Sequence, residues 1–212
     1  MGKVVLDISS SLDGFVAGPN PTLEEPLGQD GERLHEWVFP LKGWREPHGL
    51  EGGEPGEVSD LVAEGVASQG AVVMGRRMFS GGSGPWEDDP NASGWWGEEP
   101  PFRKPVFVLT HHAREPLVLG ETTFTFVTDG VESAVEQARA AVGDKDVLVA
   151  GGAEAAQQVL AAGLLDEMQL HVVPILLGSG TRLFEGFGPA GLELTRVVDS
   201  PAATHLRYRV VA

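Results

Sequence analysis

The stretch of residues 147–160 constrains the fold more than any other part of this chain. A short apolar run with two valines leads into Gly151 and Gly152, and a segment rich in Ala, Gln and Leu follows. Such a run is typical of a strand buried on both faces, and the segment after the glycines favours a helix. Two glycines allow a sharp turn and close approach of a ligand to the backbone. The first amides of the helix then form an anion site, although a tight turn that binds nothing gives the same pattern.

Composition excludes several classes of function. The 212 residues contain no cysteine, so disulfides, thiolate nucleophiles and cysteine-ligated metals are excluded. The net charge of −16 disfavours binding to nucleic acid or to anionic membranes. No apolar run is long enough to span a bilayer and no signal peptide is recognisable, so we expect a cytoplasmic protein. The length predicts one domain over residues 1–212.

The order of the elements predicts an α/β fold. Strands are predicted at 4–9, 71–75, 105–110, 124–127 and 168–173, with a terminal hairpin at 193–198 and 204–211. Helices are predicted at 33–41, 57–69 and 131–142, the second of them closed by Gly70. Irregular loops are predicted at 19–31, 44–56 and 80–104. Alternating strands and helices indicate a mostly parallel sheet with an antiparallel C-terminal hairpin and helices on both faces.

A second candidate anion site follows the strand at 71–75. Gly75, Arg76 and Arg77 stand at its carboxyl end, and ligands of open α/β sheets bind at that edge. The planar fork of arginine suits phosphate, including the 2′-phosphate that distinguishes NADPH from NADH. A solvated arginine pair on a loop is an equally compatible interpretation.

Four motifs in order resemble the dihydrofolate reductase-like superfamily, and within it the branch that contains the reductase domain of riboflavin biosynthesis, the RibD C-terminal domain. Together they span nearly the whole chain: SLDGFVA at 11–17, VMGRRMF at 73–79, VFVLT at 106–110, and VAGG at 149–152 continuing to PILLGSG at 174–180.

The resemblance implies a domain that binds NADPH across its sheet. It assigns cofactor contacts to three groups of residues and to the backbone beside the nicotinamide. These are Gly75, Arg76 and Arg77 for the phosphates of the adenosine half; Leu109, Thr110 and His111 for the adenine side; Gly151, Gly152, Ala153 and Glu154 for the pyrophosphate; and Val16 and Ala17 for the nicotinamide. Relatives also imply a cis peptide between the two glycines.

The substrate side departs from the dihydrofolate reductases. Those enzymes carry a carboxylate at the start of the second helix, and alignment on Trp37 puts Leu34 there, with Asp30, Glu32 and Glu36 nearby. Folate reduction is therefore disfavoured. Asp13 is the alternative acid, although a turn aspartate bonded to its own backbone is the commoner role. Thr181, His35 and Trp37 are candidates for substrate contact, with packing the more common role of the last two.

A riboflavin-pathway substrate carries a phosphate, and the nearby basic residues Arg33, Lys42 and Arg45 are scattered along the chain. A deaminase domain is excluded because its zinc site needs cysteines. We predict no metal site. His111 and His112 are adjacent on a strand end and point to opposite sides, and the remaining histidines (35, 48, 171 and 205) lack ligand spacing.

These observations predict an NADPH-dependent reductase that transfers a hydride to a small heterocyclic (pteridine- or pyrimidine-like) or carbonyl substrate. The alternative is a non-catalytic dinucleotide-binding protein of the same fold; a flavin enzyme has no motif in its favour. We also expect a homodimer, in which the loop carrying Trp86, Trp95 and Trp96 covers a partner or caps the pocket.

Overall fold

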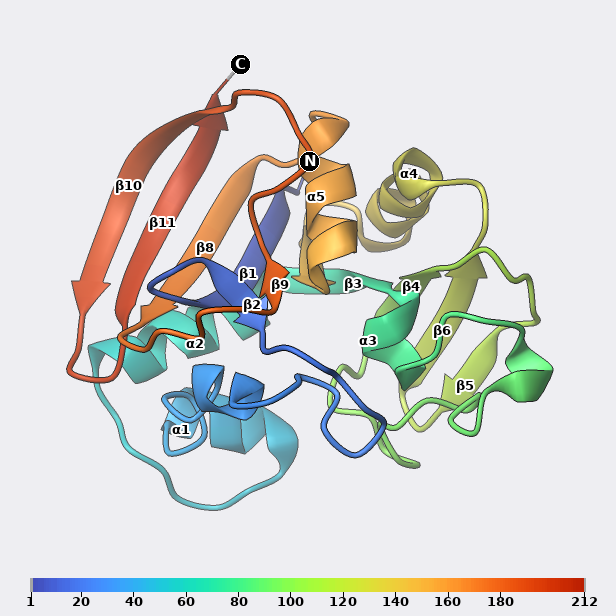
Figure 1. Cartoon of the computed structure of the whole chain (residues 1–212), viewed down its shortest axis with the longest axis horizontal. Helices are drawn as coiled ribbons and strands as arrows, with labels where there is room; N and C mark the ends of the chain where they lie inside the picture. The colour runs from blue at the N-terminus through green and yellow to red at the C-terminus, as the bar shows by residue number, and fades with distance from the viewer. Residues whose placement is uncertain (1, 212) are drawn as a thin grey trace.

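The computed structural model of the chain describes residues 2–211, and Figure 1 shows their arrangement. Its strands are β1 (Val4–Ser11), β2 (Phe15–Ala17), β3 (Gln69–Gly75), β4 (Pro105–Leu109), β5 (Leu117–Leu119), β6 (Thr122–Val127), β7 (Asp146–Gly151), β8 (Glu167–Val173), β9 (Thr181–Arg182), β10 (Gly191–Asp199) and β11 (Thr204–Val211). Its helices are α1 (Lys42–Arg45), α2 (Glu57–Ser68), α3 (Arg76–Ser80), α4 (Val131–Val142) and α5 (Ala153–Ala161), with 3-10 turns at η1 (Gly31–Leu34), η2 (Glu46–His48) and η3 (Trp86–Asp88).

Nine of these strands form one sheet, in the order β10-β11-β8-β1-β7-β3-β4-β6-β5. The six strands from β8 to β6 run parallel to one another. At the two edges, β11 pairs antiparallel with β8, β10 with β11, and β5 with β6. The predicted fold class is therefore confirmed. The strand that carries the glycine pair, β7, lies between β1 and β3 near the centre of the sheet.

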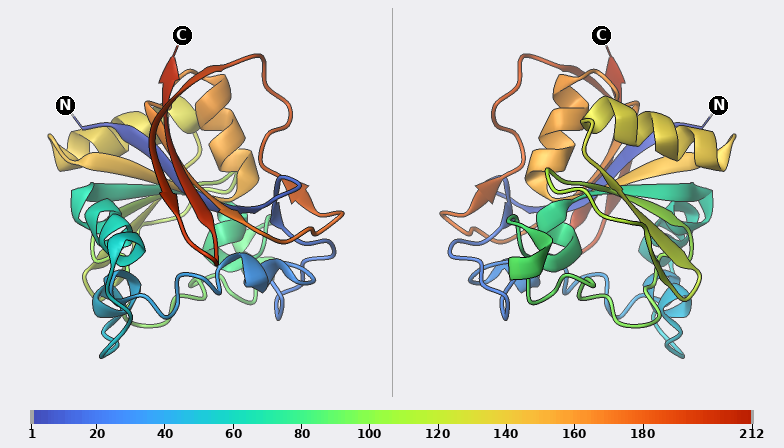
Figure 2. Two further views of the ribbon diagram at one scale, coloured as in Figure 1. Left: turned by 90° about the vertical axis from the view of Figure 1, so that its left-hand side faces the viewer. Right: turned by 90° about the vertical axis from the view of Figure 1, so that its right-hand side faces the viewer.

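Helices cover both faces of this sheet (Figure 2). On one face α4 and α5 pack their apolar sides against the strands, through residues that include Ala134, Val135 and Val159. On the other face α2 and the segment 34–44 cover the β1–β8 side, and Phe79 with Trp86 and Trp96 covers the β3–β6 side. Each central strand is thus buried on both faces, which is why these strands read as continuous apolar runs.

The helix predicted at 33–41 is wrong as an element. Its apolar residues Leu34, Trp37, Val38 and Leu41 are buried as expected, but they lie on the turn η1 and on the irregular chain after it. Pro40 lacks the amide that a continuing helix needs, and α1 begins only at Lys42. The apolar pattern therefore predicted which residues are buried, but its prediction of an α-helix was wrong.

Gly70 does not close α2 as predicted, because that helix ends at Ser68 and Gly70 already belongs to β3. A Cβ at Gly70 would lie 2.7 Å from the Cβ atoms of both Lys145 and Val142. The glycine therefore permits close approach of β3 to the end of α4. Among residues 2–211, no helix combines the length and the apolar character needed to cross a membrane.

Candidate active site

The loops after β3 and β7 meet at the carboxyl edge of the sheet. A Cβ on Gly75 would lie 3.7 Å from the amide nitrogen of Gly152 and 3.9 Å from the carbonyl oxygen of Gly151. The peptide bond between Gly151 and Gly152 is cis, as the resemblance implied. The structure therefore brings together the two sequence motifs to which cofactor binding was assigned.

Arg77 and Glu154 join these two loops on the surface. Nη1 of Arg77 lies 3.1 Å from Oε1 of Glu154, and both side chains are largely exposed. Glu154 belongs to the first turn of α5, whose first backbone amides have no acceptor within the helix. The exposed guanidinium thus stands beside the positive end of a helix, an arrangement suited to an anion.

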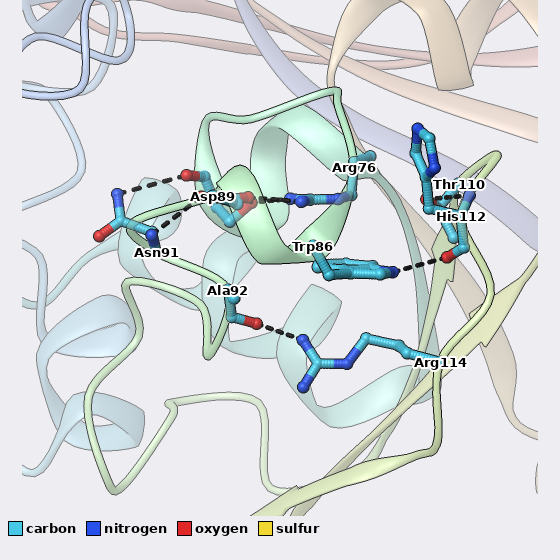
Figure 3. A network of polar contacts seen from close by, with 9 residues as sticks. Arg76, Trp86, Asp89, Asn91, Ala92, Thr110, His112 and Arg114 are labelled. Carbon is cyan, nitrogen blue, oxygen red and sulfur yellow. Dashed lines mark hydrogen bonds and ion pairs between the residues drawn. The ribbon is translucent and has the colours of Figure 1, made fainter.

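Arg76 has a different environment from its neighbour, as Figure 3 shows. Its guanidinium is buried, donates to Ser80 and Asp89, and stacks 3.6 Å from the ring centroid of Trp86. Burial would raise the pKa of Asp89, but hydrogen bonds from Ser80 and Arg76 hold it below its ordinary value. The Arg76 side chain is therefore engaged with Asp89, Ser80 and Trp86, and its assignment to the cofactor phosphates stays a prediction.

The residues assigned to the adenine side follow β4. The amide of Thr110 donates to the carbonyl of Val127 at 3.0 Å, and its hydroxyl accepts from the amide of His112 at 3.1 Å. His111 is exposed, and Leu109 is partly buried at the end of the strand. These contacts fix the backbone beside the Arg76–Trp86 cluster and leave the imidazole of His111 at the surface.

Val16 and Ala17 lie on β2, which pairs with β9. The pairing sets Thr181 opposite Ala17, so the predicted nicotinamide-side backbone and the predicted substrate-side threonine are neighbours. Val16 is buried, whereas Thr181 is exposed.

Asp13 does not fit a proton donor. Its carboxylate accepts hydrogen bonds from the amides of Leu177 and Gly178, at 3.1 and 2.7 Å. The bond with the Ser11 side chain, followed by these two backbone bonds, lowers the pKa of Asp13 from 3.8 to about 2. The group is ionised at neutral pH, and it anchors the loop after β8. Asp13 therefore ties the turn after β1 to a distant loop, which is more than the local backbone bond of an ordinary turn aspartate, and its catalytic role stays a prediction.

A cavity of about 200 Å³ lies between the sheet and the segments that cover its α2 side. Its wall includes Ala150, the residue directly before the glycine pair, whereas none of the described residues assigned to the cofactor lines it. The other lining residues are Asp7, Ile8, Ser9, His35, Trp37, Val38, Trp44, Leu61, Val62, Val66, Gln69, Gln169 and His171.

A chain of polar groups, two buried histidines and the partly exposed Asp7, ends in this cavity. Oδ1 of Asp7 lies 2.9 Å from Nε2 of His171, and Nδ1 of His171 lies 2.6 Å from Nδ1 of His205. Strand register explains the contact, because His205 on β11 stands directly opposite His171 on β8. The sequence spacing of these residues gave no signal, since the pairing depends on which strands become neighbours. The polar Asp7 within the apolar run of β1 was the one available hint.

His35 and Trp37 both line the cavity, and their contact with a substrate stays a prediction. The indole of Trp37 lies 4.4 Å from the His171 ring and 4.7 Å from the His205 ring, centroid to centroid. Its Nε1 donates to the hydroxyl of Ser9 at 3.0 Å. Nδ1 of His35 is buried and has no hydrogen-bond partner among the described residues. Burial, followed by the neighbouring His171, lowers the pKa of His35, so its imidazole is neutral at pH 7.

Comparison with known proteins decides the family. The model of the RibD C-terminal domain matches residues 2–206, nearly the whole chain. The chain belongs to the RibD C-terminal domain family. The resemblance drawn from the four sequence motifs is thereby confirmed.

Solved structures share the fold of this RibD C-terminal domain at low sequence identity. A Shewanella sp. PV-4 protein ascribed to riboflavin biosynthesis is 18% identical, with 99% of both chains covered and a TM-score of 0.62. The riboflavin biosynthesis reductase of Saccharomyces cerevisiae is 14% identical, with 100% of this chain and 89% of that one covered and a TM-score of 0.54.

A third neighbour is longer than this chain. It is the Thermotoga maritima diaminohydroxyphosphoribosylaminopyrimidine deaminase/5-amino-6-(5-phosphoribosylamino)uracil reductase, 16% identical with a TM-score of 0.59. The match covers 98% of this chain and 56% of that protein. No functionally curated protein matches the sequence significantly.

Two of these neighbours are described as reductases, and the expectation of an oxidoreductase is confirmed at the level of the RibD C-terminal domain family. Within residues 2–211, no group of three or more His, Asp or Glu side chains is arranged to hold a metal ion.

Proposed function

We propose that this protein is an NADPH-dependent reductase of a small planar heterocycle. One observation carries the proposal: Ala150 lines the 200 Å³ cavity, and the glycine pair of the proposed cofactor edge follows Ala150 directly in the chain. A hydride donor bound at the edge would then face an acceptor in the cavity, as hydride transfer requires.

The residues at the edge fit a dinucleotide. Apart from Gly152 and its two chain neighbours, no atom of residues 2–211 lies within 4 Å of the place where a Cβ of Gly152 would stand, so the backbone there is open to a ligand. The first amides of α5 and the exposed Arg77 offer hydrogen bonds and positive charge to phosphate oxygens. When bound, NADPH would supply the hydride.

The cavity favours a small aromatic substrate. Trp37 and Trp44 provide ring surfaces, while Asp7, His35 and His171 provide polar groups. Its volume is below the roughly 300 Å³ at which drug-sized ligand pockets begin, so a single small ring system fits.

The same cavity disfavours a phosphate group inside it, since none of the described residues that line it is Lys or Arg. The basic residues considered for this role have other partners. Arg33 lies 3.6 Å from Asp30, Lys42 lies 3.5 Å from Glu46, and Arg45 donates to the carbonyl of Glu51. A phosphoribosyl substrate would have to keep its phosphate outside.

Turnover separates this proposal from the non-catalytic alternative. Purified protein would be mixed with NADPH and a set of pyrimidines, pteridines and small carbonyl compounds, and NADPH oxidation would be followed by absorbance. Acceptor-dependent oxidation with at least one heterocycle supports a reductase. NADPH binding without oxidation by any acceptor favours the dinucleotide-binding protein instead.

A further inference from the structure

Gly65 lies inside α2, where a glycine is unfavourable. Glycine in the interior of a helix costs about 1 kcal/mol relative to alanine, and Gly65 does not adopt the left-handed conformation that would require it. A Cβ at this position would lie 3.5 Å from Oδ2 of Asp7 and 3.9 Å from Nε2 of Gln69, two residues that line the cavity. The missing side chain therefore leaves space directly beside the Asp7 carboxylate.

Asp7 is held by one oxygen and open at the other. Oδ1 accepts from Nε2 of His171, whereas no hydrogen bond from residues 2–211 reaches Oδ2. The Asp7 side chain is 33% exposed, in contrast to 5% for His171. A carboxylate of this kind, set against Leu61 and Val62 on the cavity wall, needs donors from a ligand or from water.

The two histidines fix the orientation of that carboxylate. When neutral His171 donates its Nε2 proton to Asp7, its Nδ1 is an acceptor and must receive the Nδ1 proton of His205. His205 then has an unprotonated Nε2, and this atom is buried without a hydrogen-bond partner among residues 2–211. Burial, followed by His171, lowers the pKa of His205 to about 4, so it stays neutral at pH 7.

We propose that Asp7 is the substrate-binding carboxylate of this protein, and that it selects a ring with an amidine edge, in which a ring N–H and an exocyclic amino group stand side by side. His171 acts as a positioning residue for Asp7. The inference rests on the proposed function for its reaction, and it replaces the carboxylate that the sequence lacks at the helix start with one from β1.

Chemistry at Oδ2 distinguishes this class from uracil-type rings. Two parallel N–H donors match the two oxygens of a carboxylate: Oδ2 is open, and Oδ1 has a second lone pair beside its bond to His171. A uracil ring flanks its N3–H with carbonyl oxygens, which a carboxylate repels. Nδ1 of His35 offers a further polar contact to a bound ring.

The test compares two free bases of similar size, isocytosine and uracil, by calorimetric titration without NADPH. Wild type should bind isocytosine at least about tenfold more tightly than uracil, equivalent to roughly 1.4 kcal/mol. Asp7→Asn should remove that preference, because an amide presents one acceptor and one donor. Equal binding of the two bases, or no binding of isocytosine, overturns the proposal.

Gly65→Ala tests the site with a variant whose fold should remain intact. Its methyl group should stabilise α2 yet weaken isocytosine binding about tenfold or more by occupying the space beside Oδ2. Ser68→Ala, an exposed change on the same helix, should leave binding unaltered. Undiminished binding by Gly65→Ala would contradict the proposal.

A spectroscopic readout tests the positioning role of His171. Isocytosine should shift the ring ¹⁵N resonances of His171 in wild type but not in Asp7→Asn; a wild-type spectrum that stays unchanged at saturation refutes the role. NADPH titration of the same samples separates the two proposals. If the protein binds isocytosine but not NADPH, the proposed cofactor is wrong and the Asp7 site stands. If it binds NADPH but not isocytosine, only the proposed Asp7 site is wrong.

Discussion

Adjacent arginines at the end of β3 have opposite environments. Arg77 is exposed beside α5, whereas Arg76 is buried on Asp89 and Trp86. The sequence predicted that both arginines lie at a ligand-binding edge of the sheet, but it could not predict that one is buried and the other exposed. The partner of Arg76 lies in the irregular loop 80–104, whose path no local pattern predicts.

Arg76→Ala should destabilise the protein by about 3–5 kcal/mol, because it leaves the buried Asp89 carboxylate without its cation. The double variant Arg76→Ala/Asp89→Ala removes the unpaired charge and should recover part of the loss. Denaturant unfolding monitored by tryptophan fluorescence measures both. A loss below about 1 kcal/mol in the single variant would show that the pair is not structural.

His205 should make folding sensitive to mild acid. Its pKa is lowered from 6.5 to about 4, so between these pH values the imidazole is protonated in the unfolded state but not in the folded state. Stability is fully present above pH 6.5 and falls as the pH drops toward 4. His35 acts in the same direction.

The check is the difference between wild type and His205→Gln in unfolding free energy at pH 7 and pH 4.5. The groups that face His205 are His171, Asp7 and Asp199, and the variant leaves all three in place. Wild type should lose more stability than the variant over this interval. Parallel losses would contradict the assignment.

At the scale of elements, strands were predictable and short connecting segments were not. The apolar runs of β1, β3, β4 and β7 predicted buried parallel strands, and the glycine pair predicted the turn before α5. The three-residue strands β2 and β5 and the turn η1 carry too few residues for a period to emerge. Their conformation depends on tertiary contacts, as with the buried Trp37 that packs outside any α-helix.

Gly70 tests the close packing of β3 against α4. Gly70→Ala should destabilise the protein by about 1–3 kcal/mol, because its methyl group would overlap the Cβ atoms of Val142 and Lys145. Gly65→Ala, with contacts no nearer than 3.5 Å, is the matched control and should raise the thermal midpoint. Equal effects of the two substitutions would contradict this packing.

At the scale of the molecule, the sheet has an exposed edge at β10 (Figure 1). Leu192, Leu194 and Val197 are each more than 40% exposed, and the bulge between Leu194 and Arg196 keeps all three on the side of their partners Val210, Tyr208 and Leu206. An open edge with apolar residues favours pairing with a second chain. The homodimer expected from sequence is therefore proposed at this edge. Trp86, offered as a partner cover, instead packs inside on Phe79 and Phe126.

Leu194→Lys/Val197→Lys should convert a dimer into a monomer in sedimentation experiments at micromolar concentration, because the new charges oppose burial of this strand. Glu193→Gln, on the opposite side of β10, should leave the assembly unchanged. A monomeric wild type, or a double variant that still dimerises, would exclude an interface at this edge.

The central claim is that the edge formed by Gly75, Arg77 and the glycine pair holds NADPH. Calorimetric titration of wild type, Arg77→Ala and Arg33→Ala with NADPH and with NADH tests it most directly. We predict tighter binding of NADPH than of NADH by wild type, a loss of about tenfold or more in NADPH affinity for Arg77→Ala, and no change for Arg33→Ala. Absence of binding to either dinucleotide, or an Arg77→Ala variant that binds NADPH as wild type does, would contradict the account.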